Sequence, residues 1–129
     1  MKDAFEKLVD TNKHLRNNCP WDKKQTLGSL KHTVVEEAEE VVQAVNNHDP
    51  ENLKEELGDL MHNIIFLTNI AEEQGMFDMK DVIEGIQEKL IRRHPHIFNG
   101  EKVSSAEEVM AIWEREKQKE KLENHIDEN

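Results

Sequence analysis

Apolar residues recur every three or four positions along most of this sequence, and the strict alternation that is typical of strands is scarce. Only five glycines and three prolines divide the chain, so the sequence predicts an all-α fold, a bundle of four to five helices. We expect helices over residues 2–16, 26–47, 50–74, 79–93 and from 104 or 105 through 113. Asp49 and Pro50 are typical of the start of the third helix, and Gly75 is typical of its end.

The last predicted helix begins with a capping box, a serine followed three residues later by a glutamate, formed by Ser104 with Glu107 or Ser105 with Glu108. Residues 116–129 are mostly charged and have few apolar side chains to bury, so we expect this tail to fray. No internal repeat or linker is visible, and 129 residues suit one core. The sequence therefore predicts a single domain over residues 1–115.

The two longest predicted helices each carry an apolar stripe at helical spacing. The stripe on residues 26–47 contains Leu27, Leu30, Val34, Ala38, Val41 and Val45, and the stripe on residues 50–74 contains Leu53, Leu57, Leu60, Met61, Ile64 and Thr68. The turn between the helices, "NHDPE", is short. We therefore expect the two helices to pack as an antiparallel hairpin.

Further apolar residues lie outside these stripes. Val35 and Val42 form a second flank on the first of the two helices, and Phe66 and Ile70 lie opposite the stripe of the second. A monomer of five helices cannot cover both faces, and a large exposed apolar patch is typical of an interface. The sequence therefore predicts a homodimer or higher homo-oligomer in which helices from neighbouring chains complete the bundle.

Four glutamates crowd into the segment "VVEEAEEVVQAV", residues 34–45. At about 100° per residue, Glu37 lies at the edge of the apolar stripe, and Glu40 and Glu36 lie on the same flank. Glu39 points to the far side, toward solvent. Three of the four carboxylates are thus expected along one edge of the buried face.

The next helix repeats this arrangement with Glu56, Asp59 and Asn63, which form a polar seam at the edge of its stripe. In an antiparallel hairpin the two acidic seams can face each other. Carboxylates held that close must take up protons or bind a cation. Because all the available ligands are oxygens, a hard ion such as Mg²⁺ or Mn²⁺ is favoured over zinc.

Other interpretations of these acids stay open. Glutamate-rich helical faces are commonly just solvated. A di-iron carboxylate bundle also uses acids from several helices, but it requires two E-x-x-H pairs, and the chain offers only the D-x-x-H pair of Asp59 and His62. A non-catalytic helical interaction or regulatory module could use the second apolar flank, although it has no need of two facing acidic seams.

The charge of the chain argues against nucleic acid as its main partner. Seventeen basic and 28 acidic residues give a net charge of -11, which repels phosphate backbones. The single cysteine, Cys19, cannot form an internal disulfide, and no N-terminal stretch resembles a signal peptide, so a cytoplasmic location is expected. The most apolar region, residues 60–70, is too short and too often interrupted to span a membrane.

Four motifs follow one another along the chain: "CPWD" at residues 19–22, E-E-x-x-E at Glu36, Glu37 and Glu40, E-x-x-D at Glu56 and Asp59, and "KLIRRHPHIF" at residues 89–98. In this order they resemble the MazG family of nucleoside triphosphate pyrophosphohydrolases, over roughly residues 3–115. The resemblance implies an all-α, dimeric, Mg²⁺-dependent enzyme of nucleotide housecleaning that hydrolyses nucleoside triphosphates to monophosphates and pyrophosphate.

The same resemblance implies that the metal ligands are Glu37, Glu40, Glu56 and Asp59, the acids that helical spacing also places on the facing seams. Some relatives carry two such domains in tandem, whereas this chain has one. The assembly that the resemblance implies would therefore depend on association between chains.

Other residues are candidates for binding or activating the reactants. Glu36 could orient or deprotonate the water, or could simply be a solvated helix residue. Lys89 and Arg93 share a face with an apolar stripe and are candidates for phosphate binding, whereas Arg92 is expected to face solvent. The alternative for these cations is stabilisation of a helix C-terminus. Lys54 is a weaker candidate for the same role.

Two tryptophans, Trp21 and Trp113, could each stack on a nucleobase or serve as a packing anchor. His94 and His96 flank Pro95 and are expected to shape the loop after the fourth predicted helix rather than to bind metal. Cys19 is interpreted as structural, because no histidine and acid accompany it in sequence.

Overall fold

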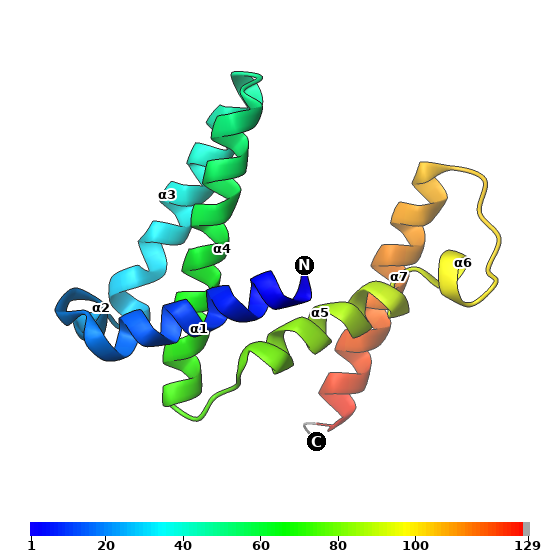
Figure 1. The fold of residues 1–129 in the computed structure, drawn as a ribbon. Helices are drawn as coiled ribbons and strands as arrows, with labels where there is room; N and C mark the ends of the chain where they lie inside the picture. The colour runs from blue at the N-terminus through cyan, green and yellow to red at the C-terminus, as the bar shows by residue number, and fades with distance from the viewer. Residues whose placement is uncertain (128–129) are drawn as a thin grey trace. The chain divides into compact units, whose positions relative to one another are not determined.

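The structure is a computed structural model that describes residues 1–127, with side chains described through residue 124. Within that range the chain forms helices and no strand (Figure 1), which confirms the predicted all-α class. The helices are α1 (Lys2–Asn18), α2 (Pro20–Lys24), α3 (Leu27–Asn46), α4 (Pro50–Glu73), α5 (Met79–Arg92), α6 (Pro95–Phe98) and α7 (Ala106–Asp127). The short helices α2 and α6 were not predicted; each begins with a proline, which suits a first helical turn.

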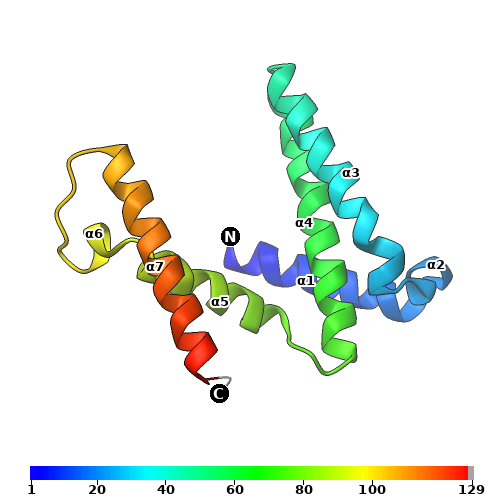
Figure 2. The same cartoon turned by 180° about the vertical axis from the view of Figure 1, so that it is seen from behind.

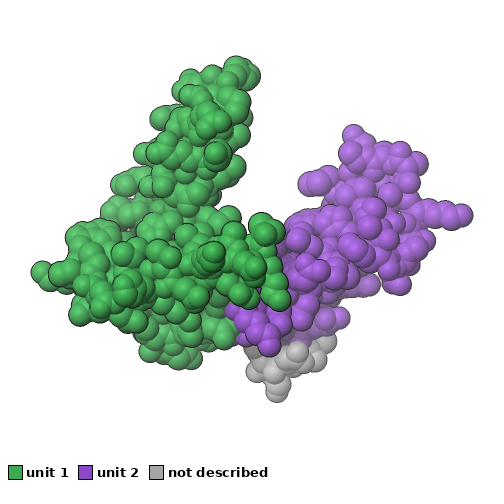
Figure 3. All heavy atoms as spheres, viewed as in Figure 1, with its two compact units in different colours: residues 1–79 green, residues 80–129 purple. Residues whose placement is uncertain are grey.

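The chain divides into two compact units, Met1–Met79 and Lys80–Asn129 (Figure 3), where the sequence predicts a single domain. The first unit contains α1 to α4 and both acidic seams. The second contains nearly all of α5 together with α6 and α7, and so carries the basic motif. In the part of the chain that the structure describes, no helix has both the length and the hydrophobicity needed to cross a membrane.

Helices α3 and α4 pack side by side as the predicted antiparallel hairpin, seen from both sides in Figures 1 and 2. Asp49 caps α4, accepting a hydrogen bond from the Asn52 backbone N–H at 3.2 Å, with Pro50 in the first turn. His48 in the turn has a φ of 51°, in the left-handed region. At the other end of α4, Gly75 adopts a φ of 72°, the conformation that its predicted capping role requires.

The buried core of the first unit lies where the start of α3 meets the C-terminal half of α4. Leu30, Phe66 and Ile70 form a buried cluster, with Leu27 and Leu67 packed against it. Helix α1 packs against both α2 and α4, so this end of the hairpin has neighbours that its other end lacks. Burying these side chains supplies the main stabilisation of the unit.

The predicted apolar stripes are wrong over much of the hairpin. Members expected inside but found exposed are Leu57, Met61 and Ile64 on α4 and Ala38 and Val45 on α3. Conversely, Phe66 and Ile70 were placed on the outer face, yet they are only 5% and 1% exposed. Where only two helices meet, each buries one narrow strip, and Phe66 and Ile70 are buried because they pack against Leu30 of α3.

Arg16 of α1 joins three elements of the first unit. Its Nε and Nη2 atoms pair with the two carboxylate oxygens of Glu73 in α4, each at 3.0 Å. Its Nη1 atom donates to the backbone carbonyl of Asp22 and to that of Gln25, the latter at 2.9 Å. Helix α2 is too short to be stable alone, and Arg16 holds its end against α1 and α4.

In the second unit, Glu120 of α7 pairs with two consecutive arginines near the end of α5. The Glu120 Oε1 atom lies 2.5 Å from the Arg92 Nε atom, and Glu120 Oε2 lies 2.8 Å from the Arg93 Nη2 atom. The hydrogen bonds from Arg93 and Arg92 lower the pKa of Glu120 to about 2. The carboxylate is therefore ionised at neutral pH and bridges the two arginines.

Helix α7 continues to Asp127, so the prediction that residues 116–129 fray is wrong for the described part of that tail. Glu120 lies inside that stretch, and its pairing with α5 supplies a tertiary contact that composition does not reveal. The predicted capping box is only half confirmed, because Ser105 caps Glu108 while the Glu108 carboxylate bonds Ser104 and not Ser105. The Glu108 backbone N–H donates to Ser105 Oγ at 3.2 Å, and the Glu108 carboxylate accepts from the Ser104 N–H at 2.8 Å.

Candidate functional site: a four-carboxylate cluster

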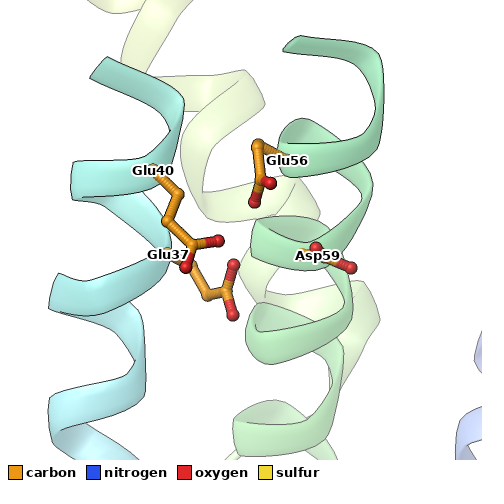
Figure 4. A group of neighbouring side chains, drawn as sticks. All are labelled: Glu37, Glu40, Glu56 and Asp59. Atoms are coloured by element: carbon orange, nitrogen blue, oxygen red, sulfur yellow. The ribbon is translucent and has the colours of Figure 1, made fainter. Parts of the chain in front are cut away.

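Two pairs of carboxylates meet between α3 and α4: Glu37 and Glu40 from α3, and Glu56 and Asp59 from α4. One oxygen from each of these residues, here called the four-acid cluster, lies within 4.8 Å of the other three. Figure 4 shows Glu37 and Glu40 reaching from α3 toward α4, with Glu56 reaching into the same gap. A three-residue spacing places each pair on one face of its helix, so the prediction that the two seams face each other is confirmed.

The crowding of negative charge changes the proton affinity of this cluster. A hydrogen bond with Glu40, followed by burial and by the charges of Glu40, Asp59 and Glu37, raises the pKa of Glu56 to about 7. Burial, followed by the charges of Glu40 and Asp59, raises the pKa of Glu37. The metal-free cluster therefore holds onto protons that isolated carboxylic acids lose well below neutral pH.

The cluster fits a hard divalent cation on two grounds. All four residues offer carboxylate oxygens, the ligands that Mg²⁺ and Mn²⁺ prefer. In addition, one buried oxygen of Glu37 and one of Glu56, Oε2 in each case, have no hydrogen-bond partner among the residues that the structure describes. Buried polar atoms are normally satisfied, and a cation between the helices would satisfy both.

Lys54 and Glu36 lie near the cluster but outside it. Lys54 lines a shallow hollow on α4 together with Asp59, and its exposed ammonium group lies 4.0 Å from the Glu51 carboxylate. Glu36 is exposed and adds a small contribution to the raised pKa of Glu37. The roles of both residues stay predictions.

One polar contact beside the cluster was not predicted. Thr33 precedes Glu37 by one helical turn, and its Oγ1 atom lies 2.7 Å from the Oδ1 atom of Asn63, which follows Asp59 by one turn. The Asn63 Nδ2 atom donates to the Asp59 carbonyl at 3.2 Å. Asn63 was expected on the acidic seam, whereas Thr33 was not predicted because its side chain is uncharged.

The second unit gives the predicted phosphate-binding arginine a partner of its own. Arg93 is 6% exposed and pairs with Glu120, as described above, while its guanidinium carbon lies 4.7 Å from the centre of the Trp113 ring. Arg92 is exposed, as predicted, although it also contacts Glu120. Lys89 is partly buried one turn before Arg93. Sequence reasoning missed Glu120, because nothing local marks it among the acids of α7.

The tryptophans and histidines have different surroundings. Trp21 is 59% exposed, with its ring edge-on to Phe66 at 6.4 Å between centroids. Trp113 instead packs beneath Arg93, and His94 meets its ring at 5.5 Å. His94 Nδ1 donates a 2.6 Å hydrogen bond to the Leu90 carbonyl, and the His94 ring lies 5.3 Å from that of His96. This packing agrees with the expectation that the two histidines shape the loop.

Sequence comparison identifies the fold that carries this cluster. The family described as the MazG nucleotide pyrophosphohydrolase domain matches residues 25–98, which include both acidic pairs. The chain belongs to the MazG family. The matched MazG segment also contains "KLIRRHPHIF" up to its last residue, whereas "CPWD" precedes it.

Several MazG relatives cover most of the chain. It is 38% identical over 122 residues to the nucleoside triphosphate pyrophosphohydrolase of Escherichia coli (strain K12), an alignment that covers 92% of this chain and 46% of that protein. It is 46% identical over 105 residues to the uncharacterized protein YabN of Bacillus subtilis (strain 168), covering 81% of this chain and 22% of that protein. The chain thus spans less than half the length of these curated relatives.

A solved structure resembles the chain over nearly its full length. The crystal structure of a MazG-related protein from Thermotoga maritima superposes with a TM-score of 0.75 at 33% sequence identity. The match covers 88% of this chain and 98% of that one. The all-helical MazG architecture described above is therefore shared with a protein of similar extent.

Proposed function

We propose that this chain is a divalent-metal-dependent nucleoside triphosphate pyrophosphohydrolase that converts ribo- or deoxyribonucleoside triphosphates to monophosphates and pyrophosphate. Mg²⁺ is the proposed physiological ion, with Mn²⁺ able to replace it. The four-acid cluster carries this proposal, because its location in a MazG domain coincides with four converging carboxylates and two orphaned buried oxygens. A non-catalytic interaction module would gain nothing from the electrostatic cost of such a cluster.

In the proposed reaction, a water oxygen attacks the α-phosphorus, the bridging bond from that phosphorus to the β-phosphate oxygen breaks, and pyrophosphate leaves. When bound to the cluster, a divalent ion supplies neutralisation of the phosphate charge and stabilisation of the leaving group. Glu36 is our candidate to take the proton of the attacking water. Its support is its position next to Glu37 with its carboxylate exposed to solvent.

Cations are proposed to bind the outer phosphates. Lys54 shares a hollow with Asp59 and is exposed, so its ammonium group can reach a phosphate bound at the cluster. Lys89 and Arg93 are proposed for the same role. Arg93 would have to share its guanidinium donors between Glu120 and a phosphate, which its five N–H groups permit.

A tryptophan is proposed to stack on the nucleobase. Trp21 is the better supported of the two, because more than half of its surface is open and its ring is held edge-on by Phe66. Trp113 already has Arg93 over its ring, so a base would compete with that guanidinium unless it approached the opposite side. Both tryptophans remain substrate-binding candidates.

A homodimer or higher homo-oligomer is proposed as the working unit. Its support is the apolar surface of the hairpin, whose exposed members include Val35, Val42 and Val45 on α3 and Leu57, Met61 and Ile64 on α4. These side chains are between 43% and 58% exposed, which is typical of an interface rather than of a solvated helix pair. We propose a cytoplasmic location, with neither nucleic acid nor membrane as a partner. The acidic net charge argues against binding to nucleic acid.

The test is a panel of nucleoside triphosphates with Mg²⁺, following pyrophosphate and orthophosphate separately. Pyrophosphate with the monophosphate is expected, and orthophosphate alone would refute the proposal. Asp59→Asn should remove most of the activity, whereas Glu39→Gln, on the exposed side of α3, is the matched control and should keep it. A protein that neither binds Mg²⁺ nor hydrolyses any nucleotide would favour the interaction module.

A further inference from the structure

Asn69 of α4 carries a buried amide without a hydrogen-bond partner. The residue is 5% exposed, and neither its Nδ2 nor its Oδ1 atom has a partner among the residues that the structure describes. The neighbouring Thr68 differs, because it is equally buried but its hydroxyl donates to the Ile64 carbonyl at 2.7 Å. Buried polar atoms are normally satisfied, so an amide with both its donor and its acceptor unused indicates a ligand.

Asn69 lines a hollow of about 300 Å³ whose walls come from α1 and α4. The charged side chains around this hollow neutralise one another. Lys13 Nζ lies 3.5 Å from Glu72 Oε2, and Arg16 pairs with both carboxylate oxygens of Glu73, as described above. These two ion pairs leave no net charge to attract an ion. The hollow therefore suits a neutral ligand that carries a hydrogen-bond donor beside an acceptor.

The side chains at the edge of this hollow can move to admit such a ligand. The two amide atoms of Asn69 are shielded from solvent, whereas the Lys13 and Glu72 side chains are about half exposed. An exposed ion pair between two long side chains contributes little to stability. Separating Lys13 from Glu72 is therefore a small cost for a ligand that satisfies the buried amide.

An aromatic ring lies close to this amide. Phe66 precedes Asn69 by three residues on the same face of α4, and the exposed ring of Trp21 lies edge-on to Phe66. Arg16, in the wall of the hollow, donates to the carbonyl of Asp22, the residue after Trp21. Two contacts thus connect the α2 ring to the hollow. An aromatic face and a free amide match the two surfaces of a nucleobase, its face and its edge.

We propose that Asn69 binds the hydrogen-bonding edge of a nucleobase in this hollow. The choice of a nucleobase rests on the proposed function, which makes nucleotides the ligands of this protein. Adenine, cytosine, guanine and uracil each present a donor beside an acceptor on that edge. Because no described residue fixes the orientation of the Asn69 amide, it can rotate to suit any of them. The site therefore requires an unblocked edge and accepts different bases.

The experiment compares adenosine and uridine with adenosine dimethylated at its exocyclic amine and with 3-methyluridine, whose methyl groups remove the donor from that edge. Calorimetric titrations of these nucleosides without metal do not involve the four-acid cluster, because nucleosides carry no phosphate. For the wild type we expect the methylated nucleosides to bind about tenfold more weakly, consistent with one net hydrogen bond. Asn69→Leu, which keeps the branched shape, should reduce that difference to about twofold or less.

Two controls show that the variant is folded and that the effect is local. Asn69→Leu should melt at or above the wild-type temperature, because it removes an unsatisfied buried amide. Thr68→Val, which removes a buried hydroxyl that is already bonded, should keep the wild-type difference between methylated and unmethylated nucleosides.

Values of kcat/KM with Mg²⁺ for ATP and for its dimethylated derivative show whose base occupies the hollow. A discrimination that Asn69→Leu removes would identify the base of the substrate itself. The same discrimination in both proteins, with nucleoside binding altered by Asn69→Leu, would identify the base of a separate molecule.

No effect of Asn69→Leu on either measurement would overturn this inference while leaving the pyrophosphohydrolase proposal intact. Absence of pyrophosphate release from every nucleotide would refute the proposed function instead. In that case the nucleoside titrations alone decide whether Asn69 binds a base, and equal binding of methylated and unmethylated nucleosides would refute it.

Discussion

Metal binding at the four-acid cluster should release protons near neutral pH. The cluster must be deprotonated to hold a cation, and crowding raises the pKa of Glu56 to about 7. Mg²⁺ affinity should therefore weaken as the pH falls through 7, a range in which an ordinary glutamate is already ionised. Replacing Glu56 by glutamine removes the group that titrates there.

The size of the effect follows from this pKa. A carboxyl with a pKa of about 7 is half ionised at pH 7 and about 1% ionised at pH 5, so the apparent affinity should fall roughly fiftyfold between those pH values. A glutamate at the ordinary value of 4.5 would give only about a 1.3-fold change over the same interval. The two cases differ enough for a single titration series to separate them.

Calorimetric titration with MgCl₂ at pH 5, 6, 7 and 8 measures this directly. We expect Glu56→Gln to bind more weakly at pH 7 and to show a much flatter pH dependence; some dependence should remain, because the pKa of Glu37 is also raised. Glu39→Gln, outside the cluster on the same helix, is the control and should match the wild type. A wild-type change below about twofold between pH 5 and pH 7, or equal behaviour of the two variants, would refute the reasoning.

The same cluster should lower the stability of the metal-free protein at high pH. Because the pKa of Glu56 is raised on folding, its contribution to stability is complete below about pH 4.5 and is lost as the pH rises through about 7. The Glu56→Gln variant should therefore have a higher melting temperature than the wild type at pH 8 but not at pH 4. A lower melting temperature of the variant at pH 8 would contradict this. Arg93→Ala should cost about 2–4 kcal/mol in urea unfolding, because it leaves Glu120 without its buried partner, whereas the exposed Arg92→Ala should cost less than about 1 kcal/mol. Equal losses of unfolding free energy in the two variants would show that the burial of Arg93 does not strengthen its ion pair with Glu120. Ile64→Glu should shift the sedimenting species toward the 15.1 kDa monomer, and an unchanged mass would remove this face of α4 from the proposed interface.

The acidic cluster could be predicted from the sequence because it depends on local spacing alone. Two acids three residues apart share a helical face whatever surrounds them, and a three-residue turn after α3 forces the second helix back alongside the first. The helix starts and ends were predictable for the same reason, since Asp49 and Gly75 act on their own backbone neighbours.

The buried face of α4 could not be predicted in this way. Leu57 and Ile64 have the same apolar character as Phe66 and Ile70, and helical spacing does not say which group will face the neighbouring helix. That choice depends on how α4 is rotated against α3, where Leu30 meets Phe66 and Ile70. The Thr33–Asn63 contact could not be predicted for a related reason, because it joins residues 30 positions apart whose side chains are uncharged.

Glu120 has a practical consequence for anyone who shortens this protein. The composition of the charged tail suggests truncating the chain near residue 115. That truncation would remove the Glu120 carboxylate, which neutralises Arg93. A buried guanidinium stripped of its partner costs about 3–5 kcal/mol, a large part of the roughly 5–15 kcal/mol that stabilises a typical domain. A chain ending at residue 115 should therefore be prone to aggregation on expression, and one ending at residue 124 should behave well; similar yields and melting temperatures for both would show that α5 tolerates the loss.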